Sequence, residues 1–184
     1  MLTERIANGR YAIASWAIYL GWAVYLFNFG VFARVAALAG GLPFPEERFD
    51  YNVGELREFF ERLGPDGIRQ YSEFQIIDCF HAFFLSVAFF LTFVYFAKRF
   101  EKPRVIRVLL LLPVLSILLE LVEDFTLRSM ANGFPEQSAE LILIVSKVTA
   151  AKLISAMIAF LAVVVLGAAS IVKFFSDRKH LNAS

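Results

Sequence analysis

The 184-residue sequence has one cysteine, Cys79, and two histidines. A single cysteine cannot form an internal disulfide, and without a CxxC pair the chain cannot act as a thiol–disulfide oxidoreductase. Haem ligation by two histidines of one chain is also excluded, because only His81 lies in an apolar segment and His180 belongs to the C-terminal tail. The patterns GxxxxGK, GxSxG and HExxH, which mark nucleotide, hydrolase and zinc sites, are missing too. We therefore expect no cofactor.

Net charge is nearly absent as well, at +1, so there is no basic field to attract nucleic acid. In contrast, 59% of the residues are hydrophobic, against about 45–50% in soluble domains. The excess falls in stretches that are long enough to cross about 30 Å of hydrocarbon. We expect an all-α, polytopic membrane protein with one domain over 1–184, a four-transmembrane-helix bundle with spans at about 11–33, 74–97, 105–127 and 141–172.

The long first loop contains a helical pattern of its own. Its apolar residues recur at the spacing of one helical stripe: Val53, Leu56, Phe59, Phe60 and Leu63. Asn52 can cap the start of this helix, and Gly64-Pro65 is a stop signal. We expect a short amphipathic helix at about 53–63, lying over the bundle or on the membrane surface.

The charges of the loops predict an orientation. Loop 34–73 has five arginines against eight acids. Three other segments, at the N-terminus, between the second and third spans and in the C-terminal tail, hold ten basic residues: Arg5, Arg10, Lys98, Arg99, Lys102, Arg104, Arg107, Lys173, Arg178 and Lys179. Because basic loops stay in the cytoplasm, we expect both termini to be cytoplasmic and the first loop to lie outside.

This orientation brings polar residues from every span into the outer half of the membrane. They are Asn28 from the first span, Gln75, Asp78 and His81 from the second, Glu120, Glu123 and Asp124 from the third, and Lys147, Thr149 and Lys152 from the fourth. A charge inside a bilayer costs about 2.5–3.5 kcal/mol even on insertion scales, so such groups face the bundle interior and pair. We expect Glu120 to lie deepest and to approach Lys152, and Asp124 to lie near the surface with Arg128 as its partner.

These residues suggest two kinds of role. For proton transfer, the candidate catalytic residues are Asp78, Glu120 and His81, because carboxyl and imidazole groups carry protons. The candidate ligand-binding residues are Asn28, Gln75, Glu123, Lys147, Thr149 and Lys152. The alternative is structural, because buried ion pairs can simply fix how helices pack. A metal site from Asp78, His81, Glu120 and Glu123 is disfavoured by the lysines and by the lack of an ExxH pair, so we expect no metal.

The layout resembles a known family. Four spans, a long first outer loop with a short helix, the acid in "FQIIDCF" and the acids in "LLELVEDF" are similar to the EXPERA-type proteins, which include the emopamil-binding protein and the sigma-2 receptor. The resemblance implies an intramembrane cavity for sterols or cationic amphiphiles, and in some members double-bond isomerisation, with Asp78 and Glu123 or Asp124 as the matching acids. Asn28 and the two lysines depart from the family pattern. "LGPDGIRQYSEFQIID" also resembles a segment of small bacterial membrane proteins, which implies no function.

The leading functional hypothesis is an integral membrane protein whose polar cavity in the outer half binds a lipid or a small amphipathic ligand, with proton-transfer, isomerase-like chemistry as an extension. Its partners would be membrane lipids, and the sequence leaves open whether it is an enzyme. One alternative is an accessory or assembly subunit of a larger membrane complex, in which the buried charges are structural. Another is a proton-coupled transporter, which would require a homodimer.

Overall fold

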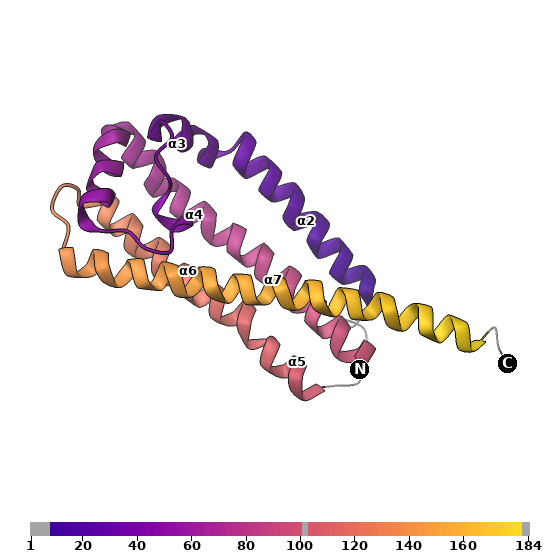
Figure 1. The fold of residues 1–184 in the computed structure, drawn as a ribbon. Helices are drawn as coiled ribbons and strands as arrows, with labels where there is room; N and C mark the ends of the chain where they lie inside the picture. The colour runs from indigo at the N-terminus through magenta and orange to yellow at the C-terminus, as the bar shows by residue number, and fades with distance from the viewer. Residues whose placement is uncertain (1–7, 101–102, 182–184) are drawn as a thin grey trace.

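The computed structural model describes residues 8–100 and 103–181, and every regular element within them is helical. This confirms the all-α expectation. In chain order the elements are α2 (Gly9–Asn28), α3 (Val31–Ala39), the 3-10 helix η1 (Pro45–Glu47), α4 (Val53–Phe100), α5 (Pro103–Leu109), α6 (Leu111–Asn132) and α7 (Ala139–Leu181). Helix α4 is central, because α2, α3, α6 and α7 all pack against it (Figure 1).

Three helical segments of the described chain are long and apolar enough to cross a membrane: Gly9–Ala39, Val53–Phe100 and Ala139–Ser176. Helix α6, which covers most of the expected third span, is not among them. Every 18-residue stretch of α6 contains Glu120, Glu123 and Asp124. These acids leave α6 without an apolar stretch of that length.

Two of the expected spans are interrupted. The stretch 11–33 is divided at Phe29–Gly30, where α2 ends and α3 begins. A β-carbon on Gly30 would lie 2.9 Å from the carbonyl oxygen of Leu26, so only glycine fits this close approach. The stretch 105–127 is divided at Leu110. Pro113 follows, and its ring opposes the carbonyl four residues earlier, which is a physical reason for a break there.

The amphipathic helix expected at 53–63 is confirmed as the first part of α4. Asn52 and Glu55 cap it reciprocally: Asn52 Oδ1 accepts from the Glu55 amide (3.1 Å) and Glu55 Oε2 accepts from the Asn52 amide (2.8 Å). Gly64, at φ 64° and ψ 178°, forms the kink after it. This conformation is essentially restricted to glycine, so the position fixes the angle at which the helix enters the bundle.

Two apolar clusters frame the middle of the bundle. One gathers Phe59, Phe60, Tyr71 and Phe74 of α4 with neighbours from α3, α6 and α7. The other is built around Phe89, Phe93, Phe96 and Ala159. On α4 the segment 75–81, on α6 the segment 116–124 and on α7 the segment 146–155 lie between the clusters. The polar residues of the chain are thus held in one layer by apolar packing on either side.

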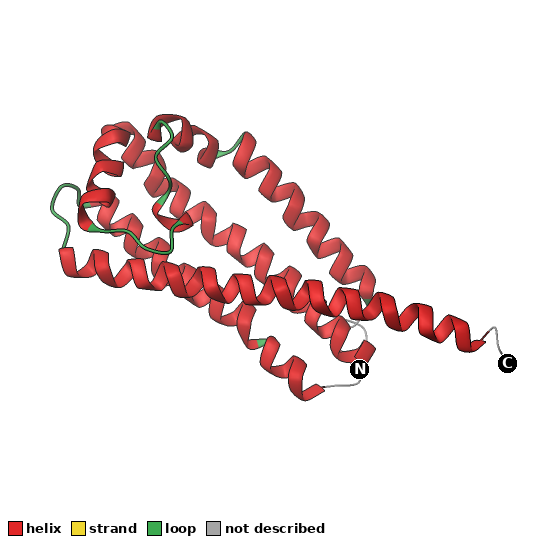
Figure 2. Ribbon diagram, viewed as in Figure 1, coloured by secondary structure: helices red, strands yellow, loops and turns green. Residues whose placement is uncertain are grey.

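The connection between α3 and α4 runs back along the bundle (Figure 2). Phe44 anchors it: its ring stacks on Phe32 at 4.5 Å between centroids and meets Phe59 and Phe74 at 5.5 and 5.8 Å. Phe44 is only 4% exposed. The aromatic anchor places the following residues, Pro45 and Glu46, in the interior.

Candidate functional site: a carboxylate-rich cavity beside an apolar groove

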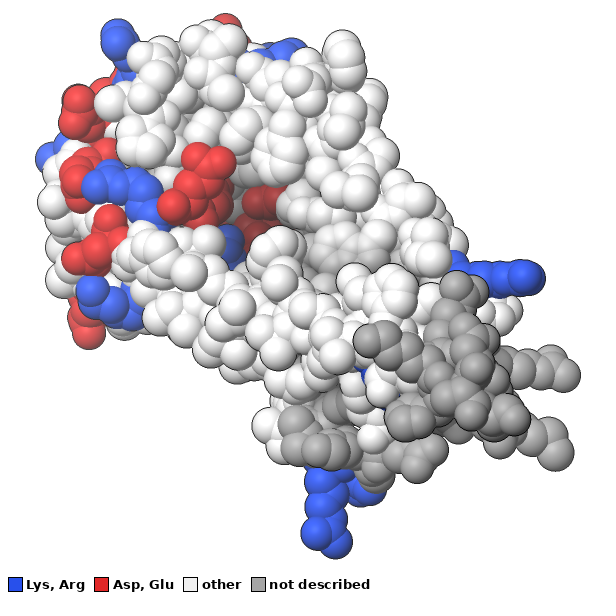
Figure 3. All heavy atoms as spheres, turned by 45° about the vertical axis from the view of Figure 1, so that its right-hand side comes forward, with Lys and Arg blue, Asp and Glu red and all other residues white. Residues whose placement is uncertain are grey.

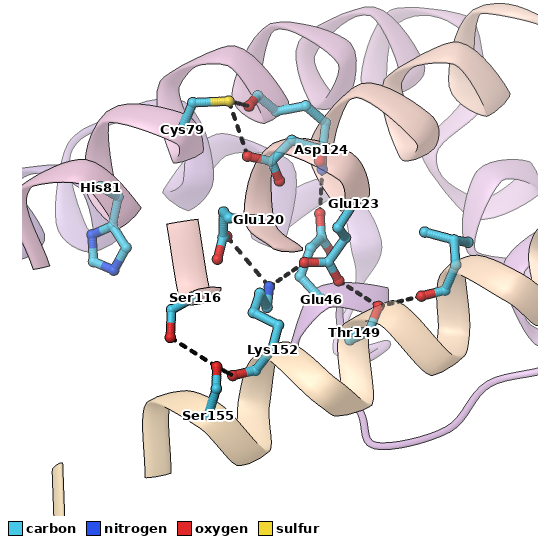
Figure 4. A network of polar contacts seen from close by, with 12 residues as sticks. Glu46, Cys79, His81, Ser116, Glu120, Glu123, Asp124, Thr149, Lys152 and Ser155 are labelled. Atoms are coloured by element: carbon cyan, nitrogen blue, oxygen red, sulfur yellow. Dashed lines mark hydrogen bonds and ion pairs between the residues drawn. The ribbon is translucent and has the colours of Figure 1, made fainter. Parts of the chain in front are cut away.

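Lys152 stands at the centre of the polar layer. Its Nζ lies 3.3 Å from Glu120 Oε1 and also forms an ion pair with Glu123 Oε2 (Figure 4). The expected approach of Glu120 and Lys152 is therefore confirmed. Within the bundle, Glu123 is fully buried while the Glu120 side chain is 12% exposed. The turn of α6 directs Glu123 into the core and leaves Glu120 at the cavity wall.

Glu123 is held by a second contact from α7. The Thr149 hydroxyl donates to Glu123 Oε1 and also lies 3.0 Å from the Val145 carbonyl. The Tyr51 hydroxyl approaches Thr149 Oγ1 at 3.4 Å, so the loop before α4 joins the same network. Glu123 thus has two partners on α7, which ties α6 to α7 in the middle of the bundle.

Asp124 is placed differently from the expectation. It is 1% exposed, and its Oδ2 accepts a hydrogen bond from the Cys79 thiol at 3.1 Å. Arg128 does not pair with it; Arg128 Nε donates to Ser72 Oγ at 3.3 Å instead. The expectation that Asp124 lies near the surface with Arg128 as its partner is therefore wrong. Helix α6 continues to Asn132, so that Asp124 lies two turns inside the helix.

Asp78 and His81 line a cavity of about 190 Å³ together with Glu46, Glu120, Ser116 and Lys152. Asp78 is 8% exposed and has no hydrogen-bond or ion-pair partner among the described residues. His81 Nε2 lies 3.5 Å from the Tyr19 hydroxyl, and its ring also contacts Phe27 edge to face. The cavity therefore combines carboxylates, an imidazole and an ammonium with aromatic walls.

Five expected site residues do not line this cavity: Gln75, Glu123 and Thr149 are buried beside it, and Asn28 and Lys147 lie away from it. Asn28 is exposed, and its amide donates to the Val24 carbonyl of its own helix at 2.8 Å. Lys147 is 69% exposed and pairs with Asp50 at 2.9 Å on the surface, where this hydrogen bond lowers the pKa of Asp50. Asn28 is the last residue of α2, whose end the sequence did not locate, and Lys147 lies five residues before Lys152, which turns it to a different face of α7.

Glu46 is a member of the site that the sequence did not reveal. It is 5% exposed, and Gln75 Nε2 donates to its Oε1, while its Oε2 has no partner among the described residues. Burial, and then the nearby Glu123 carboxylate, raise the pKa of Glu46 to about 7. Glu46 lies in a loop rich in charges, and no helical spacing links it to the buried acids.

An apolar groove of about 990 Å³ lies next to the cavity. Its walls are α2, through Trp16, Tyr19 and Leu20, and α7, through residues between Leu153 and Val164. Groove and cavity share four lining residues: Leu85, Phe89, Leu153 and Ala156. Figure 3 shows charged atoms at the floor of a hollow that borders a broad uncharged surface. The polar cavity thus borders an apolar opening on the side of the bundle.

Comparison with protein-family models, with curated proteins and with solved structures finds no match to this chain. The function therefore has to be argued from the geometry of the site.

The raised pKa of Glu46 predicts a pH-dependent stability. Because folding favours the protonated carboxyl, this contribution is complete below the ordinary pKa of 4.5 and is lost as the pH rises through about 7. Glu46→Gln mimics the protonated form, so the variant should match the wild type in acid and exceed its unfolding free energy by about 3 kcal/mol above pH 8. Unfolding in detergent from pH 5 to 9 measures the difference. Glu47→Gln, at the exposed neighbouring position, should show no such trend; an identical trend in both variants would refute the prediction.

The ion pairs of Lys152 predict a large loss of stability when the ammonium is removed. Lys152→Met leaves Glu120 and Glu123 without their cation and should cost about 3–5 kcal/mol of unfolding free energy. The double variant Glu123→Gln/Lys152→Met should recover most of that loss. Lys147→Met, which breaks the exposed pair with Asp50, should cost about 1 kcal/mol or less. Equal losses for Lys147→Met and Lys152→Met would contradict a central role for Lys152.

Proposed function

We propose that the chain is a multi-pass membrane protein with four spans, in which α6 forms the crossing that the hydropathy of single helices does not reveal. The three acids of α6 face the interior of the bundle, so the neighbouring helices shield them from the lipid. An uncharged band separates charged residues at the two ends of the molecule (Figure 3). The N-terminal end of α2 and the C-terminal end of α4 lie at one end (Figure 1). The excess of basic residues near that end supports a cytoplasmic location for it.

Within this frame, the cavity binds the polar end of a lipid or small amphipathic molecule, and the groove between α2 and α7 takes its apolar part. The observation that carries this proposal is that the two spaces are neighbours and share four lining residues: Leu85, Phe89, Leu153 and Ala156. A ligand can reach the carboxylates from the bilayer without crossing the aqueous face of the protein. Pockets that bind small molecules combine such apolar walls with a few convergent polar groups.

The cavity also supports proton transfer on the bound molecule. Asp78 and Glu120 come from different helices and line the same space, so one carboxyl can give a proton while the other takes one. His81 lines that space too and is a third group able to carry a proton. This chemistry fits the isomerase-like activity that the resemblance to the EXPERA-type proteins implies. Asp78, Glu120 and His81 are accordingly the residues proposed to act on the ligand.

The proposed topology predicts which introduced cysteines react from outside. In a Cys79→Ser background, a membrane-impermeant maleimide should label Glu58→Cys on intact cells, because loop 34–73 lies outside. Arg104→Cys should react only after permeabilisation; both positions are exposed in the structure. Labelling of both on intact cells would argue against a membrane between them, and the reverse pattern would invert the orientation.

The proposed route of the ligand predicts that blocking the junction of groove and cavity prevents binding. Ala156 lines both spaces, so Ala156→Trp should abolish retention of a co-purified lipid, measured by native mass spectrometry. Ala151, one turn earlier on α7, is exposed and lines neither space, so Ala151→Trp is the matched control and should retain the lipid. Both variants should keep their melting temperature within a few degrees.

Three other outcomes would redirect the proposal. A wild-type protein that carries no lipid at all, but purifies only with other membrane subunits, would favour the accessory-subunit alternative. Retention of lipid by both variants would place the binding site elsewhere. Loss of lipid from both would show that a bulky residue on either face of this part of α7 is disruptive.

A further inference from the structure

The buried acids outnumber the cations that could neutralise them. Four carboxyl groups, those of Glu46, Asp78, Glu123 and Asp124, are buried, and Glu120 is nearly so. Among the described residues, Lys152 is the one lysine or arginine that lines the cavity, and Glu120 and Glu123 already share it. Unpaired carboxylates do not persist in such a setting without a proton or a bound cation. The excess therefore raises the question of what else neutralises them.

Three of these acids converge on one point. Asp78 of α4 and Glu120 and Asp124 of α6 each place one carboxylate oxygen within 4.8 Å of the other two. Atoms at these separations leave a point no more than about 2.8 Å from all three, and Ca²⁺ binds carboxylate oxygens at about 2.3–2.6 Å. Glu120 and Asp124 are one helical turn apart, and Asp78 comes from the helix packed against them. Small side-chain rotations would complete a three-oxygen site.

The partners of these carboxylates point to a ligand at the same place. Asp124 Oδ2 accepts a hydrogen bond from the Cys79 thiol, but Asp124 Oδ1 is buried and has no partner in the described part of the chain. Asp78, nine-tenths buried, faces the cavity, and neither of its oxygens has a hydrogen-bond or ion-pair partner among the described residues. Native proteins rarely leave buried polar atoms unsatisfied, so each such atom calls for a cause. One cation between the three acids would account for both residues.

The structure also removes the main objection to a cation. The sequence suggested that two lysines oppose one, but Lys147 lies on the surface with Asp50. Lys152 contacts Glu120 at 3.3 Å and also Glu123, so Glu120 shares the ammonium, whereas Asp124 lies beside Cys79 (Figure 4). Only oxygen atoms converge in the group, which favours a hard cation over zinc or copper.

We propose that Asp78, Glu120 and Asp124 bind a divalent cation with a preference for oxygen ligands, of the Ca²⁺ and Mn²⁺ class. The site lies at the wall of the cavity, where the cation offsets most of the negative charge that Lys152 leaves. The proposal does not depend on the lipid route, because its ligands come from α4 and α6 rather than from the groove between α2 and α7. Asp78 and Glu120 can carry protons only while no cation is bound to them.

Mn²⁺ is the probe for the test, because its paramagnetic signal reports binding directly. Full-length protein in detergent is freed of metal with a chelator and titrated with Mn²⁺ by electron paramagnetic resonance, with Ca²⁺ and Mg²⁺ as competitors. We expect about one Mn²⁺ per chain, displaced by Ca²⁺, and at least tenfold weaker binding in Asp78→Asn and in Asp124→Asn. Glu58→Gln removes an exposed acid and should bind as the wild type does.

A second measurement covers variants that fail to fold. A cation that binds only the native state raises its melting temperature, so the stripped wild type should melt higher with Mn²⁺ or Ca²⁺ than without. The proposal is overturned if the wild type shows neither saturable Mn²⁺ binding nor this rise, or if folded Asp78→Asn and Asp124→Asn bind Mn²⁺ as Glu58→Gln does. Leu20→Trp, at a position that lines the groove but not the cavity, should bind Mn²⁺ normally, which separates this result from the lipid proposal.

Discussion

The packing of the helices depends on the ammonium group of Lys152, which lies among buried acids. Lys152 holds Glu120 and Glu123 at a depth where charges are costly, and Thr149, one turn before it on α7, fixes Glu123 from the same side. A buried pair of this kind contributes little net free energy, but removing one partner is expensive. The ion pairs of Lys152 therefore specify how the helices pack: they set the register of α6 against α7. That register in turn decides which face of α6 the remaining acids occupy.

The arrangement divides the acids by role. Glu123 is enclosed by α7 and has its partners, whereas Asp78 and Glu120 line open space and Asp124 keeps a free oxygen. The loop before α4 adds Glu46, which Phe44 carries inside by its aromatic contacts. The polar groups that have partners thus hold the helices together around a cavity in which other polar groups of the described residues lack partners. The paired groups specify the structure, and the unpaired groups are where a ligand, a proton or a cation can be accommodated.

Sequence reasoning succeeded where helical periodicity and depth carried the information. It predicted the all-helical chain, the helix at 53–63 and the approach of Glu120 to Lys152, because these follow from spacing along regular helices. It failed where helices break or where a loop enters the core. Asn28 was misplaced because the end of α2 was unknown, and Lys147 because five residues separate it from Lys152 and turn it to a different face of α7. Glu46 was missed because no pattern in a charged loop predicts burial. The contact of Asp124 with Cys79 arises from the packing of α4 on α6, which no local signal encodes.

The position of Lys152 so late in the chain bears on how the protein is made. If the chain spans a bilayer as proposed, α6 enters the membrane during synthesis before its cation has been translated. Three acids on one helix resist partitioning into lipid, at about 2.5–3.5 kcal/mol each near the centre. Stable residence of α6 in the hydrocarbon must then wait for α7 to follow it, so the last two helices are inserted as a pair. Truncation before α7 would leave not a three-helix intermediate but a chain whose third helix has no place in the membrane.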